Sequence, residues 1–252
     1  ARSSWSGKWA FILAAAASAV GLGNMWRFPY LAAQYGGGTF LLTYLVLVFT
    51  FGVSLLLLET ALGRKTGQSA IGAFRTFGKK YAFIGVLAAT VPFIITPYYC
   101  IIGGWVTKYT AAYLINGPAA LADDGGFFTG FITSNTESFL WMLLFMAIVF
   151  IVVSLGVKGG IEKANLIMMP ALIIMAVCIA IYTMTMPGAL DGVLYYLVPD
   201  FSKFSPELVI GALGQMFYSL SLAMGIMITY GSYLDKKSSL TQSVTRIGGF
   251  DI

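Results

Sequence analysis

The chain has 252 residues, of which 58% are hydrophobic and only 10% are charged, whereas a soluble domain carries roughly a quarter charged residues. So little charge cannot coat a globule in water, and we predict that this surface faces a lipid bilayer. The formal net charge is +5, but the lysines and arginines fall mostly in short loops between apolar runs, which argues against a nucleic-acid partner.

Uncharged apolar runs divide the chain, and a helix needs about 20 such residues to cross the hydrocarbon core. The runs extend from Trp9 to Trp26, Phe28 to Leu58, Tyr81 to Thr107, Ser138 to Val157, Ala164 to Leu190 and Leu208 to Leu234. The second run is too long for one span, and the glycines at 36–38 suit a tight turn between two helices. We predict an all-α membrane protein with a single transmembrane domain over 1–252. The expected helices cover about 9–35, 40–63, 81–115, 138–157, 162–186 and 206–234, with a seventh starting from 241.

Basic residues gather on one side of the predicted helices. That side carries Arg2, Lys8, Arg64, Lys65, Arg75, Lys79, Lys80, Lys158, Lys163, Lys236, Lys237 and Arg246. The opposite side carries Asp123, Asp124, Glu137, Asp191, Asp200, Lys203 and Glu207. Because short cytoplasmic loops carry an excess of lysine and arginine, we predict a multi-pass protein of the cell membrane with a cytoplasmic N-terminus.

Two of the predicted helices contain segments that are poorly suited to a continuous helix. The first holds Ser-Ala-Val-Gly-Leu-Gly-Asn at residues 18–24, and the sixth holds Ser-Leu-Ser-Leu-Ala-Met-Gly at residues 219–225. Glycine is about 1 kcal/mol less favourable than alanine inside a helix. The alternative interpretation is that these glycines permit close packing between membrane helices.

Asn24 and Arg27 favour the interpretation that the segments are unwound. An arginine within an apolar run is costly and usually lines a pathway or pairs with a partner. Unwound backbone at membrane depth is tolerated where it lines a cavity, and there its carbonyl and N–H groups become ligands. Glycine-interrupted segments at matching positions of two inverted repeats are typical of secondary transporters. We therefore expect helices one to five to form one repeat and the sixth to open the next.

Several ordered motifs resemble the neurotransmitter:sodium symporter family, especially its bacterial amino-acid transporters. Residues 19–30 are similar to the family's first-helix signature, and the glycine triplet follows at the expected distance. The other matching residues are Glu59, Gly63 and Arg64 in the second helix, Tyr98, Tyr99, Gly103, Gly104 and Trp105 in the third, and residues 215–233 in the sixth. The resemblance implies an inverted-repeat symporter fold with broken first and sixth helices, of which this chain holds the first repeat and helix six.

The resemblance implies two sodium sites. The first would use the backbone carbonyl of Ala19, the side chain of Asn24 and the hydroxyl of Ser219, with the substrate carboxylate as another ligand. Asp251 falls at a seventh-helix ligand position where the family more often has asparagine; the alternative is an ordinary residue near a helix start. Oxygen-only coordination suits a hard cation. The second site would use the backbone carbonyls of Ala17 and Val20.

The resemblance also implies an amino-acid site. Backbone N–H groups of Gly21, Leu22 and Gly23 and the hydroxyl of Tyr99 would hold a carboxylate, and the carbonyls of Ala19, Tyr218 and Ser219 would take the ammonium group. Glycine at position 21 favours an amino acid, because monoamine-carrying relatives have an aspartate there. The side-chain pocket would be lined by Ile95, Ile102, Tyr218, Ser221 and Met224, which favours a large aliphatic or aromatic substrate.

Further residues around this site match family positions. Arg27 resembles the outer gate arginine, and Arg2, Trp5 and Tyr233 resemble an inner latch. Glu59 resembles a buried glutamate that steadies the unwound segments, with a carboxylate reaching the interface beside Arg64 as the alternative. Chloride is a second candidate ion, because Tyr44, Gln215 and Ser219 match the chloride ligands of chloride-dependent relatives. Alternatively, a nearby carboxylate supplies that charge, and Asp251 is the candidate.

The predicted function is sodium-coupled symport of an amino acid by alternating access. An enzyme would need a nucleophile–base pair or metal ligands, and the chain has no histidine and no clustered carboxylates. A channel would place polar rings along several helices, whereas here the polar signals concentrate on two. Two alternatives stay open: a symporter of a different amine or osmolyte, and a fragment that does not transport alone because it stops as the seventh helix begins. The sequence does not indicate an oligomeric state.

Overall fold

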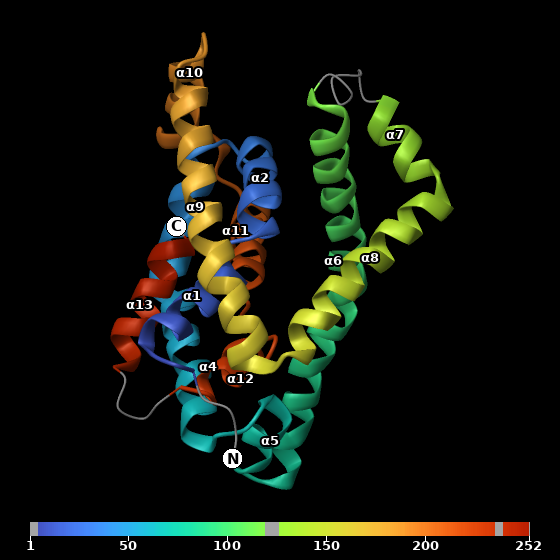
Figure 1. The fold of residues 1–252 in the computed structure, drawn as a ribbon. Coiled ribbons are helices and arrows are strands. Elements are labelled where there is room, and N and C mark those ends of the chain that lie inside the picture. The colour runs from blue at the N-terminus through green and yellow to red at the C-terminus, as the bar shows by residue number, and fades with distance from the viewer. Residues whose placement is uncertain (1–4, 119–125, 235–238, 252) are drawn as a thin grey trace. The chain divides into compact units, whose positions relative to one another are not determined.

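A computed structural model describes residues 5–118, 126–234 and 239–251, without the side chains of Lys8 and Phe250. Within these residues the regular structure is helical, apart from one isolated antiparallel bridge between Gly37 and Pro199. The chain divides into two compact units (Figure 1), one of Ala1–Ala89 with Val157–Ile252 and the other of Thr90–Gly156. The all-α prediction is confirmed.

The described residues form a series of helical segments. In chain order they are α1 (Lys8–Ala19), η1 (Gly23–Arg27), α2 (Phe28–Gln34), α3 (Gly38–Leu47), η2 (Val48–Gly52), α4 (Val53–Thr66), α5 (Ala70–Arg75), η3 (Lys79–Tyr81), α6 (Ala82–Asn116), α7 (Gly126–Thr133), α8 (Asn135–Ser154), η5 (Val157–Glu162), α9 (Lys163–Met184), α10 (Ala189–Leu197), η6 (Phe201–Lys203), α11 (Pro206–Ser219), α12 (Ile226–Gly231) and α13 (Leu240–Asp251). The segments η1, η2 and η5 are π-helical, and η3 and η6 are single turns of 3-10 helix.

The first predicted helix is broken where the sequence indicates. α1 ends at Ala19, Val20 is extended with φ −86° and ψ 104°, and helical structure resumes in η1 and α2. The two arms are bent by 40°. A break of this kind leaves the last carbonyls of one arm and the first N–H groups of the next without partners in the helix.

The sixth predicted helix is broken as well. α11 ends at Ser219 and α12 begins at Ile226, and between them Ser221 and Ala223 have positive φ values of 53° and 59°. A left-handed conformation costs roughly 1–2 kcal/mol for a residue other than glycine. With 14 and 6 residues, neither arm reaches the length of about 20 residues that crosses a bilayer. The sixth span therefore needs both arms.

The glycine triplet forms the tight turn between α2 and α3. Gly36 and Gly37 have φ values of 83° and 54°, and α3 begins at Gly38. The turn also lies against α10, because a Cβ on Gly37 would stand 2.1 Å from the carbonyl oxygen of Tyr195. Glycine is required here both for the backbone conformation and for the close approach.

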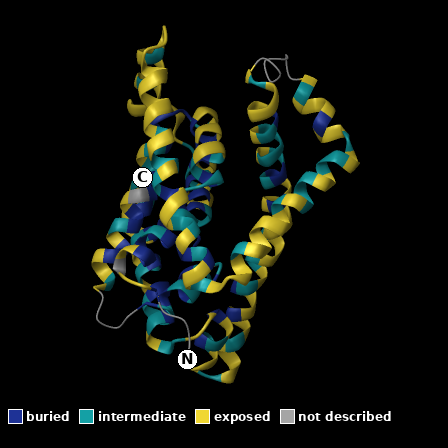
Figure 2. Ribbon diagram, viewed as in Figure 1, coloured by how far each residue is buried: buried dark blue, intermediate teal, exposed yellow. Residues whose placement is uncertain are grey.

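Much of the apolar surface lies outside the packed centre. Four continuous helical segments, at 38–66, 79–116, 135–154 and 157–184, are long and apolar enough to cross a membrane, and the bent first pair makes a fifth. α8 has no buried residue and α9 has one, Met169. The core of the first unit is built on side chains such as Phe11, Phe40 and Met216, and Figure 2 shows its buried residues in the middle of that unit and exposed ones along α9. This distribution suits a protein that has lipid as its solvent.

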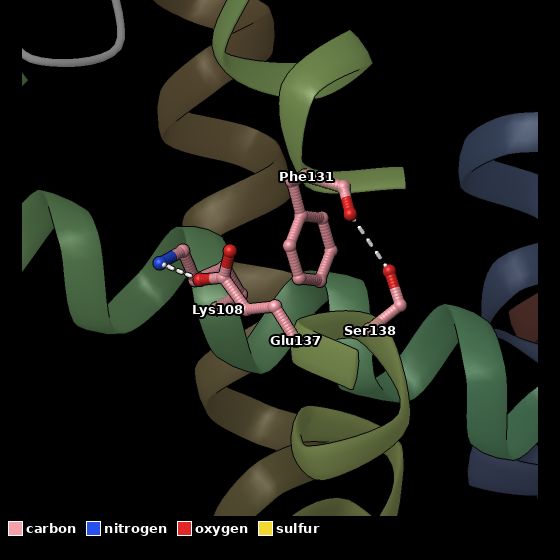
Figure 3. A network of polar contacts seen from close by, with 4 residues as sticks. All are labelled: Lys108, Phe131, Glu137 and Ser138. Atoms are coloured by element: carbon pink, nitrogen blue, oxygen red, sulfur yellow. Dashed lines mark hydrogen bonds and ion pairs between the residues drawn. The ribbon is translucent and has the colours of Figure 1, made fainter. Parts of the chain in front are cut away.

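In the second unit, one lysine joins α6 to α7 and α8. Nζ of Lys108 lies 2.5 Å from Oε1 of Glu137. Its ammonium group also lies 5.6 to 5.9 Å from the ring centroids of Phe127, Phe131 and Trp141. Figure 3 shows Lys108, Phe131 and Glu137 of this group, with the Ser138 hydroxyl donating to the carbonyl of Phe131 at 2.9 Å. The ion pair and the surrounding rings therefore fix α7 against its two neighbours.

Candidate functional site

The two interrupted helices meet at their breaks. The hydroxyls of Ser18 and Ser221 are 3.0 Å apart, and the Ser221 hydroxyl also lies 3.1 Å from the Ser18 carbonyl. Nε2 of Gln215 donates to the carbonyl of Gly23 at 3.0 Å. Polar groups therefore hold the two break segments together. Some of these groups are backbone carbonyls, which in a continuous helix would bond to N–H groups of the same helix.

Four side chains from four helical segments converge beside the breaks, and together they are named the polar centre: Asn24, Tyr44, Ser219 and Asp251. Oγ of Ser219 lies 3.1 Å from Oδ1 of Asn24 and hydrogen-bonds the Asp251 carboxylate. Nδ2 of Asn24 donates to the backbone carbonyl of Asp251 at 2.8 Å and to its Oδ1 at 3.1 Å. The Tyr44 hydroxyl donates to Oδ2 of Asp251 at 2.5 Å. The Asp251 carboxylate is therefore the hub of the polar centre.

The donor set of the polar centre suits a hard monovalent cation. Oδ1 of Asn24, Oγ of Ser219 and the Asp251 carboxylate offer oxygen atoms, and oxygen is the ligand that hard cations prefer. Asp251 is only 6% exposed, and its negative charge can offset the charge of a cation taken out of water. A cavity of about 110 Å³ adjoins these residues. Its lining is formed by Asn24, Phe28, Leu41, Tyr44, Tyr196 and Asp251.

The backbone atoms predicted as sodium ligands lie at the end of the first arm. Ala17 and Ala19 belong to the last turn of α1, and Val20 follows it. The last carbonyls of a helix lack N–H partners within that helix, so they are free to serve as ligands. The backbone carbonyls predicted for the two sodium sites therefore belong to one helix end.

The predicted substrate residues of the first and sixth helices surround the breaks. A Cβ on Gly21 would have no atom within 4 Å, so another molecule can approach the backbone there, whereas Gly23 is packed against the Tyr218 ring at 3.1 Å. The Arg27 guanidinium lies over that ring, 5.1 Å from its centroid. The other members of this group are Leu22 next to the first break and Ser219, Ser221 and Met224 in or beside the second.

Three predicted substrate residues lie on α6 in the second unit. Ile102 is buried, Ile95 is partly buried and Tyr99 is exposed within the described chain. Their contribution to a substrate site stays a prediction.

Glu59 is directed at the second break. Its side chain is 9% exposed, and its Oε1 accepts a hydrogen bond from the backbone N–H of Ala223 at 2.7 Å. Its Oε2 is buried without a hydrogen-bond partner among the described residues. A buried carboxylate that holds one unwound N–H group stabilises a backbone conformation that would otherwise leave this donor without a partner.

The inner-latch residues that the structure describes lie in contact. Nε1 of Trp5 donates to the carbonyl of Tyr230 at 3.1 Å, and its ring meets those of Tyr230 and Tyr233 edge-on at 5.4 and 6.2 Å. Trp5 is 7% exposed. The segment before α1 is therefore fixed to α12 and the chain after it. Arg2 lies outside the described residues.

One contact of the segment before α1 was not predicted from the sequence. Ser6 donates its backbone N–H to Glu162 at 3.1 Å and its hydroxyl to the same carboxylate, which is 5% exposed. The available signal was an acidic residue on the side of the helices that otherwise carries basic ones. That signal marks Glu162 as unusual but does not identify Ser6 as its partner.

Comparison with known proteins places these features in one family. The sequence profile of the sodium:neurotransmitter symporter family matches residues 2–117 and 132–249. The uncharacterized sodium-dependent transporter YhdH of Bacillus subtilis (strain 168) is 36% identical over 248 residues, which cover 96% of this chain and 55% of that protein. The sodium- and chloride-dependent transporter XTRP3 of Homo sapiens is 30% identical over 262 residues, which cover 92% of this chain and 44% of that protein.

A solved structure is similar along the whole chain. The crystal structure of MhsT in complex with L-phenylalanine matches with a TM-score of 0.92 and 39% sequence identity, covering 100% of this chain and 58% of that one. The chain spans about half the length of the curated relatives it matches. The fold with two broken helices is thus shared with a solved amino-acid complex.

Proposed function

The chain belongs to the sodium:neurotransmitter symporter family, a family of transporters rather than enzymes, and on that premise we propose that it carries the ion and substrate site of a sodium-coupled amino-acid symporter. The observation that carries the proposal is the polar centre beside two facing helix breaks. Buried charge and unwound backbone at membrane depth are costly unless they bind something.

In the proposed mechanism, sodium enters as a transported ion. The polar centre takes one ion through Asn24, Ser219 and Asp251, together with the carbonyl of Ala19. A second ion uses the carbonyls of Ala17 and Val20. The name of the Bacillus subtilis relative, a sodium-dependent transporter, supports this choice of ion.

We propose that transport is independent of chloride. The hydroxyls of Tyr44 and Ser219, two of the predicted chloride ligands, both donate to the Asp251 carboxylate. The third, Gln215, donates its amide N–H to the carbonyl of Gly23. A chloride ion beside Asp251 would place two like charges in one buried site, where their repulsion is strong. The Asp251 carboxylate therefore supplies the negative charge that chloride supplies in chloride-dependent relatives.

The proposed substrate is an L-amino acid with a large aliphatic or aromatic side chain. The similarity to MhsT, which was crystallised with L-phenylalanine, supports this class. The carboxylate lies at the N–H groups around Gly21, next to the start of η1, where the helix dipole favours a negative charge. Sodium and substrate carboxylate then attract each other, so each raises the affinity of the other. Rocking of the first and sixth helices exposes the site to one side of the membrane at a time.

The test is amino-acid binding to the full-length protein in sodium chloride against potassium chloride. We expect sodium-dependent binding of phenylalanine, leucine or tryptophan and weak binding of glycine or 4-aminobutyrate. Ser219→Ala should lower sodium-dependent affinity by roughly tenfold or more, because a hydrogen bond to a charged group contributes about 1.5–3 kcal/mol.

Ser54→Ala is the matched control. It removes an exposed hydroxyl that donates to the carbonyl of Thr50, four residues earlier in η2, at 2.9 Å, so affinity should not change. Binding that is equal in potassium and sodium, or an equal loss in both variants, would contradict the proposal.

A further inference from the structure

An apolar groove lies in the first unit between α4, α5 and the start of α6. Its volume is about 710 Å³. The lining includes Leu58, Ala61, Leu62 and Lys65 of α4, Phe74 of α5 and Ile84 of α6. It shares no residue with the polar centre or with either helix break, so the proposed transport function does not account for it.

The α4 residues of the groove form one stripe that ends in a cation. Leu58, Ala61, Leu62 and Lys65 are spaced by three, four and seven positions, which places them on one face of a helix. Leu58 is 60% exposed. The stripe thus presents apolar side chains followed by a positive charge, and a phospholipid presents an acyl chain followed by a phosphate in the same order.

The stretch of chain that forms the groove is strongly basic. No acidic residue occurs between Thr60 and Ala122. The same stretch carries Arg64, Lys65, Arg75, Lys79 and Lys80. Nζ of Lys65 lies 5.9 Å from the ring centroid of Phe77, and Nζ of Lys80 lies 5.1 Å from that of Tyr81; both rings line the groove. Aromatic rings beside lysines are typical of the level of the lipid headgroups.

We propose that this groove is a binding site for an anionic phospholipid, with an acyl chain along the α4 stripe and the phosphate at Lys65 and Lys80. Clusters of basic residues at the membrane surface attract anionic headgroups, and each one strengthens binding by roughly fivefold. The concave apolar lining adds shape to this attraction, so that one lipid is retained at a defined place.

The groove is packed against the broken sixth helix, which gives the lipid a route to influence the transporter. Leu62 and Phe74 pack against a small cluster of Ala70, Ala73, Ala88 and Ile228. A Cβ on Gly225, at the end of the second break, would stand 2.8 Å from Cβ of Ala70. A lipid that fills the groove supports α5 at this contact, so we expect it to raise the melting temperature of the protein.

Native mass spectrometry of the full-length transporter tests the site, with phosphatidylglycerol compared against phosphatidylethanolamine. We expect preferential retention of one phosphatidylglycerol. Lys65→Gln should weaken that retention about fivefold, and Ala61→Phe should reduce it further by placing a ring in the groove. Lys163→Gln is the matched control: it removes an exposed lysine at the start of α9, outside the groove, and should leave retention unchanged.

A photo-crosslinker gives a second readout that does not depend on these variants. With p-benzoylphenylalanine in place of Leu58, we expect a covalent adduct with the mass of phosphatidylglycerol. A crosslink to a peptide of the same protein would show that another part of the chain fills the groove and would overturn the proposal. Equal retention of both lipids by the unmodified protein, or full retention by both groove variants, would overturn it as well.

Discussion

Two glycines, one in each compact unit, serve opposite purposes. In the second unit, a Cβ on Gly104 would stand 2.7 Å from the backbone nitrogen of Met142, so the glycine permits α6 and α8 to approach closely. In the first unit, a Cβ on Gly21 would meet no atom within 4 Å, and Gly21 lies in a break. The residue type is the same, but Gly104 permits close packing between two helices, whereas Gly21 lies where a helix is interrupted.

The neighbours of each glycine account for the difference. α6 continues through Gly104 and even through Pro92 and Pro97, and the atoms that a Cβ on Gly104 would meet belong to the backbone of α8. The break at Gly21 has Asn24 and Ser18 close in sequence, and these side chains bond to residues of α13 and of the sixth-helix break. A break in a membrane helix therefore needs polar partners as well as a permissive residue.

The largest expected effect is that of a larger side chain at Gly104, the glycine at the contact between α6 and α8. Gly104→Val should prevent close approach of α6 to α8, because the added side-chain atoms would collide with backbone atoms of α8, which cannot move away as a flexible side chain could. Overpacking costs about 1–3 kcal/mol, so we expect the ratio of folded to unfolded protein to fall by up to roughly a hundredfold. The measurement is the monodisperse peak of the full-length protein in size-exclusion chromatography.

Gly21→Ala is the control for this effect. It should give a normal peak, because the added methyl group meets no neighbour, while lowering sodium-dependent phenylalanine binding at the break. A folded yield of Gly21→Ala as low as that of Gly104→Val would show that the two glycines do not differ in how closely their neighbours pack.

A smaller effect is expected when the hub of the polar centre loses its charge. Asp251→Asn keeps the shape of the side chain but removes the negative charge of the carboxylate, which accepts hydrogen bonds from the hydroxyls of Tyr44 and Ser219. Hydrogen bonds to a charged group contribute about 1.5–3 kcal/mol, so sodium affinity should fall by roughly tenfold or more. Binding should also become sensitive to chloride, since two hydroxyl donors are released for an anion. The measurement compares sodium chloride with sodium gluconate.

Asp191→Asn is the matched control, because this aspartate is exposed in the first turn of α10. It should leave both the sodium affinity and the response to chloride unchanged. If Asp251→Asn behaves in the same way, the carboxylate neither binds sodium nor substitutes for chloride.

The sequence predicted the helices and their breaks because both are local properties. Apolar runs of sufficient length and glycine beside polar residues can be recognised within a short window, and the break after Ala19 follows from them. The positive φ of Ser221 and Ala223 could not be predicted, because neither residue favours that conformation and tertiary contacts impose it.

Contacts between distant segments were the other part that sequence reasoning missed. Ser18 meets Ser221 across 203 positions and Ser6 meets Glu162 across 156, and periodicity carries no information about such pairs. The meeting of Asn24, Ser219 and Asp251 was predicted only through resemblance to a family whose members place ligands at those positions.

The smallest expected effect concerns the attachment of the N-terminal end of α1, the end that lies away from the first helix break. α1 has 12 residues, and a helix of about 12–15 residues is marginal without tertiary packing. Trp5 and Ser6 fix its start, the latter through two hydrogen bonds to Glu162. Ser6→Ala removes the hydroxyl bond but keeps the backbone N–H bond, so the loss is about 1 kcal/mol. Amide exchange in the peptide that contains Trp5 should therefore accelerate by roughly fivefold.

Ser232→Ala removes a hydroxyl that donates to Thr229 within the same helical turn, and exchange near Trp5 should not change in that variant. Equal rates in both variants would mean that Glu162 does not hold the N-terminal segment. A fivefold change confined to Ser6→Ala would show that a broken helix needs attachment at its outer end as well as ligands at its break. An arm this short has too few hydrogen bonds of its own to keep its position when the other end is unwound.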